Sequence, residues 1–224
     1  MSAGGSAGGS ADGRDSLIPQ AHRLILVRHA HSQVDPQRDP HTWGLTERGR
    51  RDAARLAALA LFDHASGYYA GAEPKMEQTL APVAAAHGMT VQPEAALGET
   101  GSKGWLAEEG QFKAVVRRFF DQPQAPPAPG WETRAEATER FQGAVERLLT
   151  RHPVVVHPGH ALPGTVAIAS GGRMLCAYLA HSLGLDAAQA FAVWSALRMP
   201  DLAVLELAPE RTAFLVVPFG TIAY

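Results

Sequence analysis

Four side chains in this sequence have the types that bind and transfer a phosphoryl group. Arg28 and His29 stand together directly after a short apolar run, Lys75 lies where a helix is predicted to begin, and Glu99 lies in a later loop. A neutral imidazole is a good nucleophile near pH 7, and cations hold phosphate oxygens through charge-assisted hydrogen bonds. A carboxylic acid can protonate the leaving oxygen. His29 is therefore a candidate nucleophile and Glu99 a candidate proton donor.

Each of these residues also has an ordinary structural interpretation. The chain holds 10 histidines, so an Arg-His pair arises readily by chance. Lys75 and Glu99 are of the kind usually found as solvated surface charges. Their order along the chain, and the elements that precede them, decide between the two interpretations.

Predicted strands would bring these side chains to one edge of a sheet. Short apolar runs at 24–27, 68–70 and 166–169 are predicted strands, and in α/β sheets ligands bind at the carboxyl ends of the strands. The third run ends in Ser170-Gly171-Gly172, where a helix is predicted to begin. Free N–H groups and the helix dipole favour an anion there, although two glycines can also serve a turn.

Strands and helices alternate through most of the chain, which predicts an α/β fold. Thr46 is a suitable cap for the first helix, and Gly88 stands where the second is expected to stop. The predicted helices cover 46–61, 75–87, 108–120, 136–150, 172–183 and 187–197, and the remaining strands cover 90–92, 202–207 and 213–217. Residues 154–156 are a strand or part of a long loop, and the last two strands are expected to pair as an antiparallel hairpin. We predict a three-layer sandwich with a mainly parallel central sheet flanked by helices.

Length and composition indicate one domain after a tail. The chain has 224 residues, of which 46% are hydrophobic, enough for one full-sized core at 21–224. Residues 1–20 are rich in Gly and Ser and lack the apolar middle of a signal peptide, so we expect a flexible tail. No apolar run is long enough to span a membrane.

Charge and cysteine content bound the partners and the compartment. A net charge of -2 argues against nucleic acid or an anionic membrane as the main partner. The single cysteine, Cys176, permits no intrachain disulfide and favours a reducing compartment. We expect a cytoplasmic protein.

Several ordered motifs resemble the histidine phosphatases of the phosphoglycerate-mutase-like superfamily. The run 24–30 is similar to the opening strand and Arg-His-Gly signature of that family, and 44–49 is similar to its Leu-Thr-x-x-Gly element. The segment 74–79 resembles Arg-Ala-x-Gln-Thr, and 104–106 resembles a Gly-x-Trp that follows the family's acid. Trp131-Glu132-Thr133 also fits, and the resemblance runs from about Leu24 to Leu207.

The resemblance implies a role for each candidate residue. His29 would be the phosphorylated nucleophile, Arg28 and Lys75 would hold phosphate oxygens, and Glu99 would protonate the leaving group. The ligand would be a small phosphorylated substrate or phosphate. Neither a metal nor an organic cofactor is expected.

The sequence departs from the family pattern at three positions. Ala30 replaces the glycine of the signature, and Lys75 replaces a second arginine, which keeps the charge but loses the bidentate fork. Gly171 stands where the family has its second active-site histidine. Removing one such preorganised donor costs on the order of 10²–10³ in rate. His157 or His160 could substitute for it, or both could simply belong to a polar surface loop.

Three functions remain open at this point. The first is a phosphomonoester hydrolase that acts through His29 and Glu99 with reduced activity. The second is a catalytically impaired pseudo-phosphatase that binds a phosphorylated ligand or partner, and the third is an α/β domain unrelated to phosphate. The apolar last strands also allow a homodimer.

Overall fold

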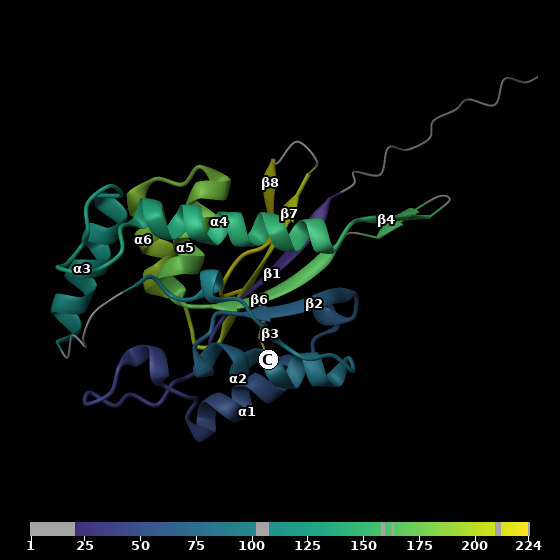
Figure 1. Ribbon diagram of the computed structural model, residues 1–224, viewed down its shortest axis with the longest axis horizontal. Helices are drawn as coiled ribbons and strands as arrows, with labels where there is room; N and C mark the ends of the chain where they lie inside the picture. The colour runs from purple at the N-terminus through teal and green to yellow at the C-terminus, as the bar shows by residue number, and fades with distance from the viewer. Residues whose placement is uncertain (1–20, 102–107, 158–159, 163, 209–211, 224) are drawn as a thin grey trace, which may run out of the picture.

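The computed structural model describes residues 21–101, 108–157, 160–162, 164–208 and 212–223. The predicted tail at 1–20 and the Gly-x-Trp motif at 104–106 lie outside these residues. Figure 1 shows a central sheet with helices packed on both of its faces.

The main sheet has six strands in the order β3-β2-β6-β1-β7-β8. The strands are β1 (His22–Arg28), β2 (Ala65–Ala70), β3 (Gln92–Pro93), β6 (Thr165–Ser170), β7 (Asp201–Leu207) and β8 (Ala213–Val217). The first four in this order are parallel, whereas β7 runs antiparallel to β1 and β8 antiparallel to β7. The predicted mainly parallel sheet and the predicted hairpin of the last two strands are both confirmed.

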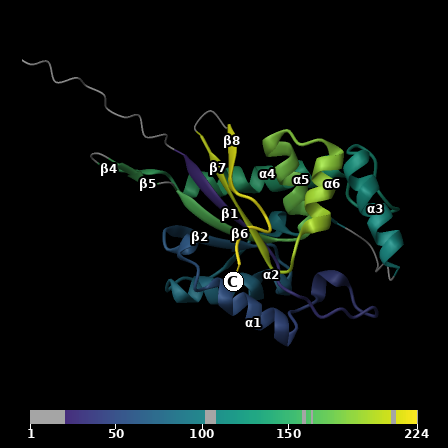
Figure 2. The ribbon, with the colours of Figure 1, turned by 180° about the vertical axis from the view of Figure 1, so that it is seen from behind.

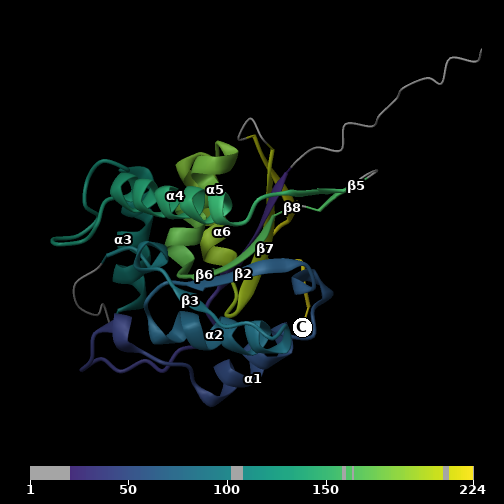
Figure 3. The same ribbon diagram turned by 45° about the vertical axis from the view of Figure 1, so that its right-hand side comes forward.

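Helices cover the two faces of the sheet in separate groups. Helices α1 (Glu47–Leu56) and α2 (Pro74–Ala86) lie on one face, and α4 (Arg134–Arg151), α5 (Gly172–Leu183) and α6 (Ala187–Ala196) lie on the other, with α3 (Glu109–Asp121) beyond them (Figures 1 and 3). The predicted three-layer sandwich is confirmed. Within the described residues, no helix combines the length and the apolar character needed to cross a membrane.

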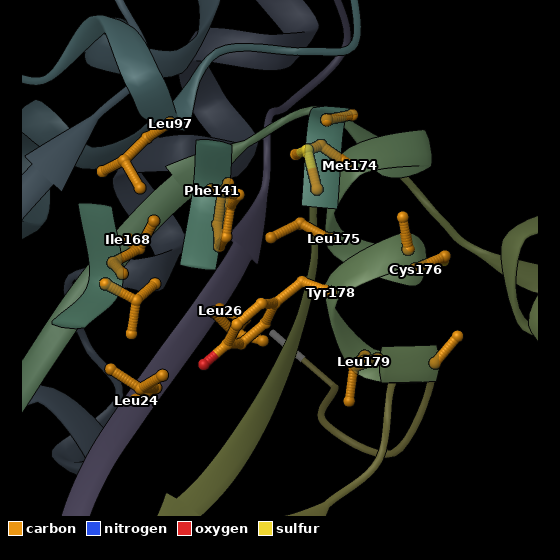
Figure 4. Packing of buried hydrophobic residues seen from close by; sticks show 14 of the residues in the cluster. Leu24, Leu26, Leu97, Phe141, Ile168, Met174, Leu175, Cys176, Tyr178 and Leu179 are labelled. Atoms are coloured by element: carbon orange, nitrogen blue, oxygen red, sulfur yellow. The ribbon is translucent and has the colours of Figure 1, made fainter. Parts of the chain in front are cut away.

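The central strands are buried on both faces, which explains their continuous apolar sequence. In β1, Leu24 and Leu26 pack toward α4 and α5, and the alternate residues Ile25 and Val27 pack toward α1 and α2. Figure 4 shows the first of these two core layers, where Leu24, Leu26 and Ile168 meet residues of α5.

Helix α1 ends earlier than predicted. Thr46 caps it as expected, accepting a hydrogen bond from Gly49 N at 3.0 Å, but the helix stops at Leu56 instead of near Leu61. A short 3-10 turn follows at Ala60–Phe62. At about 100° per residue, a continuous helix would turn Phe62 away from the face that carries Leu56. The break allows both side chains to enter the same core cluster.

Residues 155–157 and 160–162 form a separate pair of strands, which settles the alternatives left open for 154–156. Strands β4 (Val155–His157) and β5 (His160–Leu162) pair only with each other in the described residues. The hairpin leads into the amino end of β6, where Arg23 N donates to Gly164 O at 3.2 Å, and it projects from that end of the sheet (Figure 2). It therefore lies at the end opposite to Arg28 and Ser170.

Candidate active site

His29 follows directly on β1 at the carboxyl edge of the sheet. Its backbone N donates to Ser170 O of the neighbouring strand at 3.1 Å, and its side chain is only 8% exposed. The ring atom Nδ1 lies 2.9 Å from Ala30 O. A carbonyl oxygen can only accept, so we assign the proton to Nδ1, which leaves Nε2 with a free lone pair. Nε2 is the atom that can attack phosphorus.

The surroundings of His29 keep its imidazole neutral. Burial, followed by the positive charge of Lys75, lowers the pKa of His29 to about 3, although the hydrogen bond to Ala30 opposes the shift. The positive charge of Arg28 acts in the same direction as burial. A neutral histidine is the form needed for nucleophilic attack.

The pH dependence of His29 follows from this pKa. We expect an NMR titration to show the ring neutral from pH 8 down to about 4, instead of protonating near its ordinary value of 6.5. Because only the unfolded chain gains this proton between pH 6.5 and about 3, His29 is expected to lower the free energy of unfolding as the pH falls through that range. A titration midpoint near 6.5 would show that the ring is solvated and would contradict the assignment.

Arg28 is held against the start of α5. Its Nη1 donates to Leu197 O at 2.8 Å and to Arg198 O at 3.3 Å, while its Nε is buried without a hydrogen-bond partner among the described residues. A Cβ added at Gly172 would lie 3.1 Å from that Nε, which is tighter than nine in ten real Cβ contacts, so glycine favours the close approach. The guanidinium therefore retains one buried donor.

Lys75 is paired with a carboxylate that the sequence analysis missed. Its Nζ lies 2.7 Å from Glu73 Oε2 and donates to Pro40 O at 2.7 Å. Both side chains of the ion pair are almost fully buried, at 7% and 6% exposure. Glu73 precedes the predicted helix by two residues, and nothing in its spacing distinguished it from a surface charge. Its proximity reduces the positive charge that Lys75 can present to a phosphate.

Glu99 lies on the N-terminus of α5, the point predicted to bind an anion. Its Oε1 accepts hydrogen bonds from Thr100 N at 2.8 Å and Met174 N at 3.0 Å, and its Oε2 accepts one from Arg173 N at 3.2 Å. The Arg173 Nε atom lies 3.6 Å from the same Oε2. The anion site therefore exists, and a carboxylate of this chain fills it.

The carboxylate of Glu99 also fills the space beside Gly171. A Cβ added at Gly171 would lie 2.8 Å from the Glu99 Cβ and closer still to the carboxylate. Real Cβ atoms essentially never make such contacts. The place of a side chain at position 171 is thus already taken.

Glu99 is ionised in this arrangement. Burial alone would raise the pKa of Glu99, but the charge of Arg173 and the N–H groups of Thr100 and Arg173 outweigh burial and hold the pKa below its ordinary value. His29 contributes in the same direction, which places the two candidate catalytic groups within electrostatic reach of each other. As a proton donor, Glu99 would first have to take up a proton.

A partly buried ion pair holds the loop that carries Glu99. Arg140 contacts Glu132 twice, at 2.9 Å and 2.8 Å, and its Nη1 donates to Ala96 O at 2.7 Å. Glu132 in turn accepts from Gly101 N at 2.8 Å. The sequence singled out the motif around Glu132 but did not show that it holds this loop.

A cavity of about 410 Å³ opens beside Glu99. It is lined by His41, Glu73, Glu99, Glu132, Arg140 and small residues of the adjoining loops. A larger cavity of about 760 Å³ lies away from His29, between α4, α5 and the last two strands. Over the part of the chain that the structure describes, no three His, Cys, Asp or Glu residues are grouped so that they could hold a metal ion.

The structure gathers Arg28, His29, Lys75 and Glu99 at the carboxyl edge of the sheet. Arg173 was missed, although an arginine just after Gly171-Gly172, in a helix that is mostly apolar, was a usable signal. The side chains of His157 and His160 lie outside what the structure describes. The backbone of their hairpin runs at the opposite end of the sheet, which gives no support to a substitute histidine.

Comparisons with known proteins agree with this architecture. A model of the histidine phosphatase superfamily (branch 1) matches residues 24–217. No curated protein matches the chain.

Solved structures match over almost the whole chain. A mycobacterial hydrolase has a TM-score of 0.73 at 19% identity, covering 90% of this chain and 100% of its own. A mycobacterial glucosyl-3-phosphoglycerate phosphatase has a TM-score of 0.72 at 18% identity, covering 88% and 98%. An Entamoeba histolytica phosphoserine phosphatase in complex with phosphoserine has a TM-score of 0.64 at 14% identity, covering 89% and 97%. Identities this low establish a shared fold. The mycobacterial phosphatase has also been solved with inorganic phosphate and with VO3.

Proposed function

Because this chain belongs to the histidine phosphatase superfamily (branch 1), we propose that it hydrolyses phosphate monoesters through a phosphohistidine on His29. The observation that carries the proposal is the state of His29, which is buried, neutral and fixed by Ala30 so that Nε2 is free. Arg28 and Lys75 lie close enough to His29 for their positive charges to lower its pKa. A phosphate site requires such cations beside the nucleophile. Small phosphorylated compounds are the proposed substrates.

The reaction has two steps in this proposal. His29 Nε2 attacks phosphorus while the bond from phosphorus to the ester oxygen breaks, and the departing oxygen takes a proton from Glu99. Water then attacks the phosphohistidine and gives its proton to the Glu99 carboxylate, which releases phosphate and restores His29. Glu99 is protonated at the start of this cycle and again at its end, so the ionised carboxylate must take up a proton before the first turnover.

Two features support a reduced rate. Glu99 is ionised and bound to the N-terminus of α5, so a proton donor must be formed before an alkoxide can leave. Position 171, where the resemblance implies a histidine, contributes no side chain. The same two features favour the alternative function, a pseudo-phosphatase that binds a phosphorylated ligand or partner.

Hydrolysis of esters with different leaving groups distinguishes the phosphatase from the pseudo-phosphatase. We expect the purified protein to hydrolyse an aryl phosphate, whose phenolate leaves without a proton, at least about tenfold faster than an alkyl phosphate, because Glu99 is ionised. In a single turnover, Glu99→Gln is expected to transfer the phosphoryl group from the aryl ester to His29 at nearly the parent rate. The same variant is expected to react more slowly with the alkyl ester. Binding of vanadate without hydrolysis of either ester would identify a pseudo-phosphatase.

A further inference from the structure

The carboxylate of Glu99 marks an anion site at the start of α5. Its ligands are the N–H groups of Arg173 and Met174, with the Arg173 guanidinium beside them. Helix α5 is 12 residues long, so its dipole adds to the attraction. Because this carboxylate occupies the side-chain space of position 171, the site lies where the resemblance implies a phosphate-binding histidine.

Arg173 is fixed beside this site and incompletely bonded. Its side chain is nearly buried, its guanidinium lies 4.7 Å from the ring centre of Trp131 and 5.7 Å from that of Phe112, and its Nη2 donates to Thr100 O at 3.4 Å. Across the described residues, its Nη1 is buried with no hydrogen-bond partner. A buried charged donor without a partner is costly, so its retention points to a ligand.

We propose that Arg173 binds the transferring phosphoryl group and so replaces the histidine expected at position 171. This inference rests on the proposed phosphatase function. When Glu99 turns toward the leaving oxygen, phosphoryl oxygens take the place of its carboxylate against the N–H groups of α5 and the guanidinium of Arg173. Arginine suits this role because its charge does not titrate and its planar fork can bind two oxygens at once.

Glu99 and the phosphoryl group therefore exchange one site. At rest the carboxylate satisfies the helix N-terminus and the adjacent guanidinium, and in the substrate complex the phosphate does so. The exchange also releases Glu99 for its proposed role at the leaving oxygen. A residue that merely positioned Glu99 would have no direct effect on phosphate binding, which provides the test.

The test compares the parent with Arg173→Gln and Arg173→Lys, using aryl phosphate hydrolysis and inhibition by vanadate. We expect Arg173→Gln to lower kcat/KM for the aryl ester by about 10²–10³ and to weaken vanadate inhibition, with a smaller loss in Arg173→Lys. The same loss is expected in a Glu99→Gln background. Arg117→Gln is the matched control, because Arg117 also lies over an aromatic ring, 5.2 Å from that of Phe191, but on the exposed surface of α3.

Each of the following outcomes would overturn the inference. Unchanged vanadate inhibition, or a loss that disappears in the Glu99→Gln background, would show that Arg173 only holds Glu99. If the parent hydrolyses the ester and Arg173→Gln does so equally well, the proposed role of Arg173 is rejected while the phosphatase function stands. A parent that neither hydrolyses the ester nor binds vanadate would reject the function itself. Thermal unfolding shows whether each variant is folded. If Arg173→Gln does not fold, the test uses Arg173→Lys, and full activity in that variant would count against the inference.

Discussion

Replacing His29 with alanine is expected to reduce aryl phosphate turnover by about 10³-fold or more, because the variant has no atom that can form the phosphoryl intermediate. The other proposed phosphate ligands, Arg28, Lys75 and Arg173, stay in place. Vanadate should therefore still bind, although less tightly. Initial rates and vanadate inhibition, measured on the same preparation, check both parts of this expectation.

The control for this variant is a partly buried histidine that lies away from the site. His152 contacts Ser66 Oγ at 3.0 Å and Tyr69 Oη at 2.8 Å near the amino end of the sheet. His152→Ala is expected to lower stability and leave the rate constant for aryl phosphate hydrolysis within about twofold. Turnover that survives in His29→Ala would rule out His29 as the nucleophile.

The second large effect concerns Gly171. The resemblance implies a histidine at this position, so Gly171→His is the substitution that would restore the family pattern. In the structure any side chain at 171 collides with the Glu99 carboxylate, which must then leave the N–H groups of Arg173 and Met174. We therefore expect Gly171→Ala and Gly171→His each to lower the free energy of unfolding by about 1–3 kcal/mol, through overpacking and loss of a helix cap.

Neither Gly171 variant is expected to exceed the parent in turnover. Gly110→Ala is the matched control, since a Cβ at Gly110 meets nothing within 4 Å and should leave stability unchanged or slightly raised. Urea unfolding and aryl phosphate hydrolysis measure the two effects. If Gly171→His were as stable as the parent and turned over faster, Glu99 would have to vacate the site without cost, contrary to the contacts described above.

Local sequence signals predicted the elements that position the site. The continuous apolar run that ends at Arg28 identified a strand buried on both faces, and Thr46 and Gly88 marked helix limits that the structure confirms. The end of α1 was predicted wrongly because the break serves a distant requirement, the burial of Phe62 beside Leu56. Such a tertiary contact leaves no periodic signal in the helix itself.

The sequence predicted which residue types lie in the site but not which of these residues contact one another. The sequence placed a cation at Lys75 and an acid at Glu99, yet it could not show that Glu73 neutralises the lysine. Nor could it show that Glu99 binds α5, because that contact joins residues more than seventy positions apart. The glycine at 171 looked like a loss from sequence alone, and only the structure shows that another group of the chain fills the space.

The most direct test of the account is a search for the phosphohistidine. Protein mixed with a labelled aryl phosphate and quenched in alkali within a single turnover should carry the label on the peptide that contains His29, and acid should release it, because a phosphorus–nitrogen bond is labile to acid. We expect label on His29 in the parent and none in His29→Ala. Turnover without label on His29, or label on another residue, would contradict it.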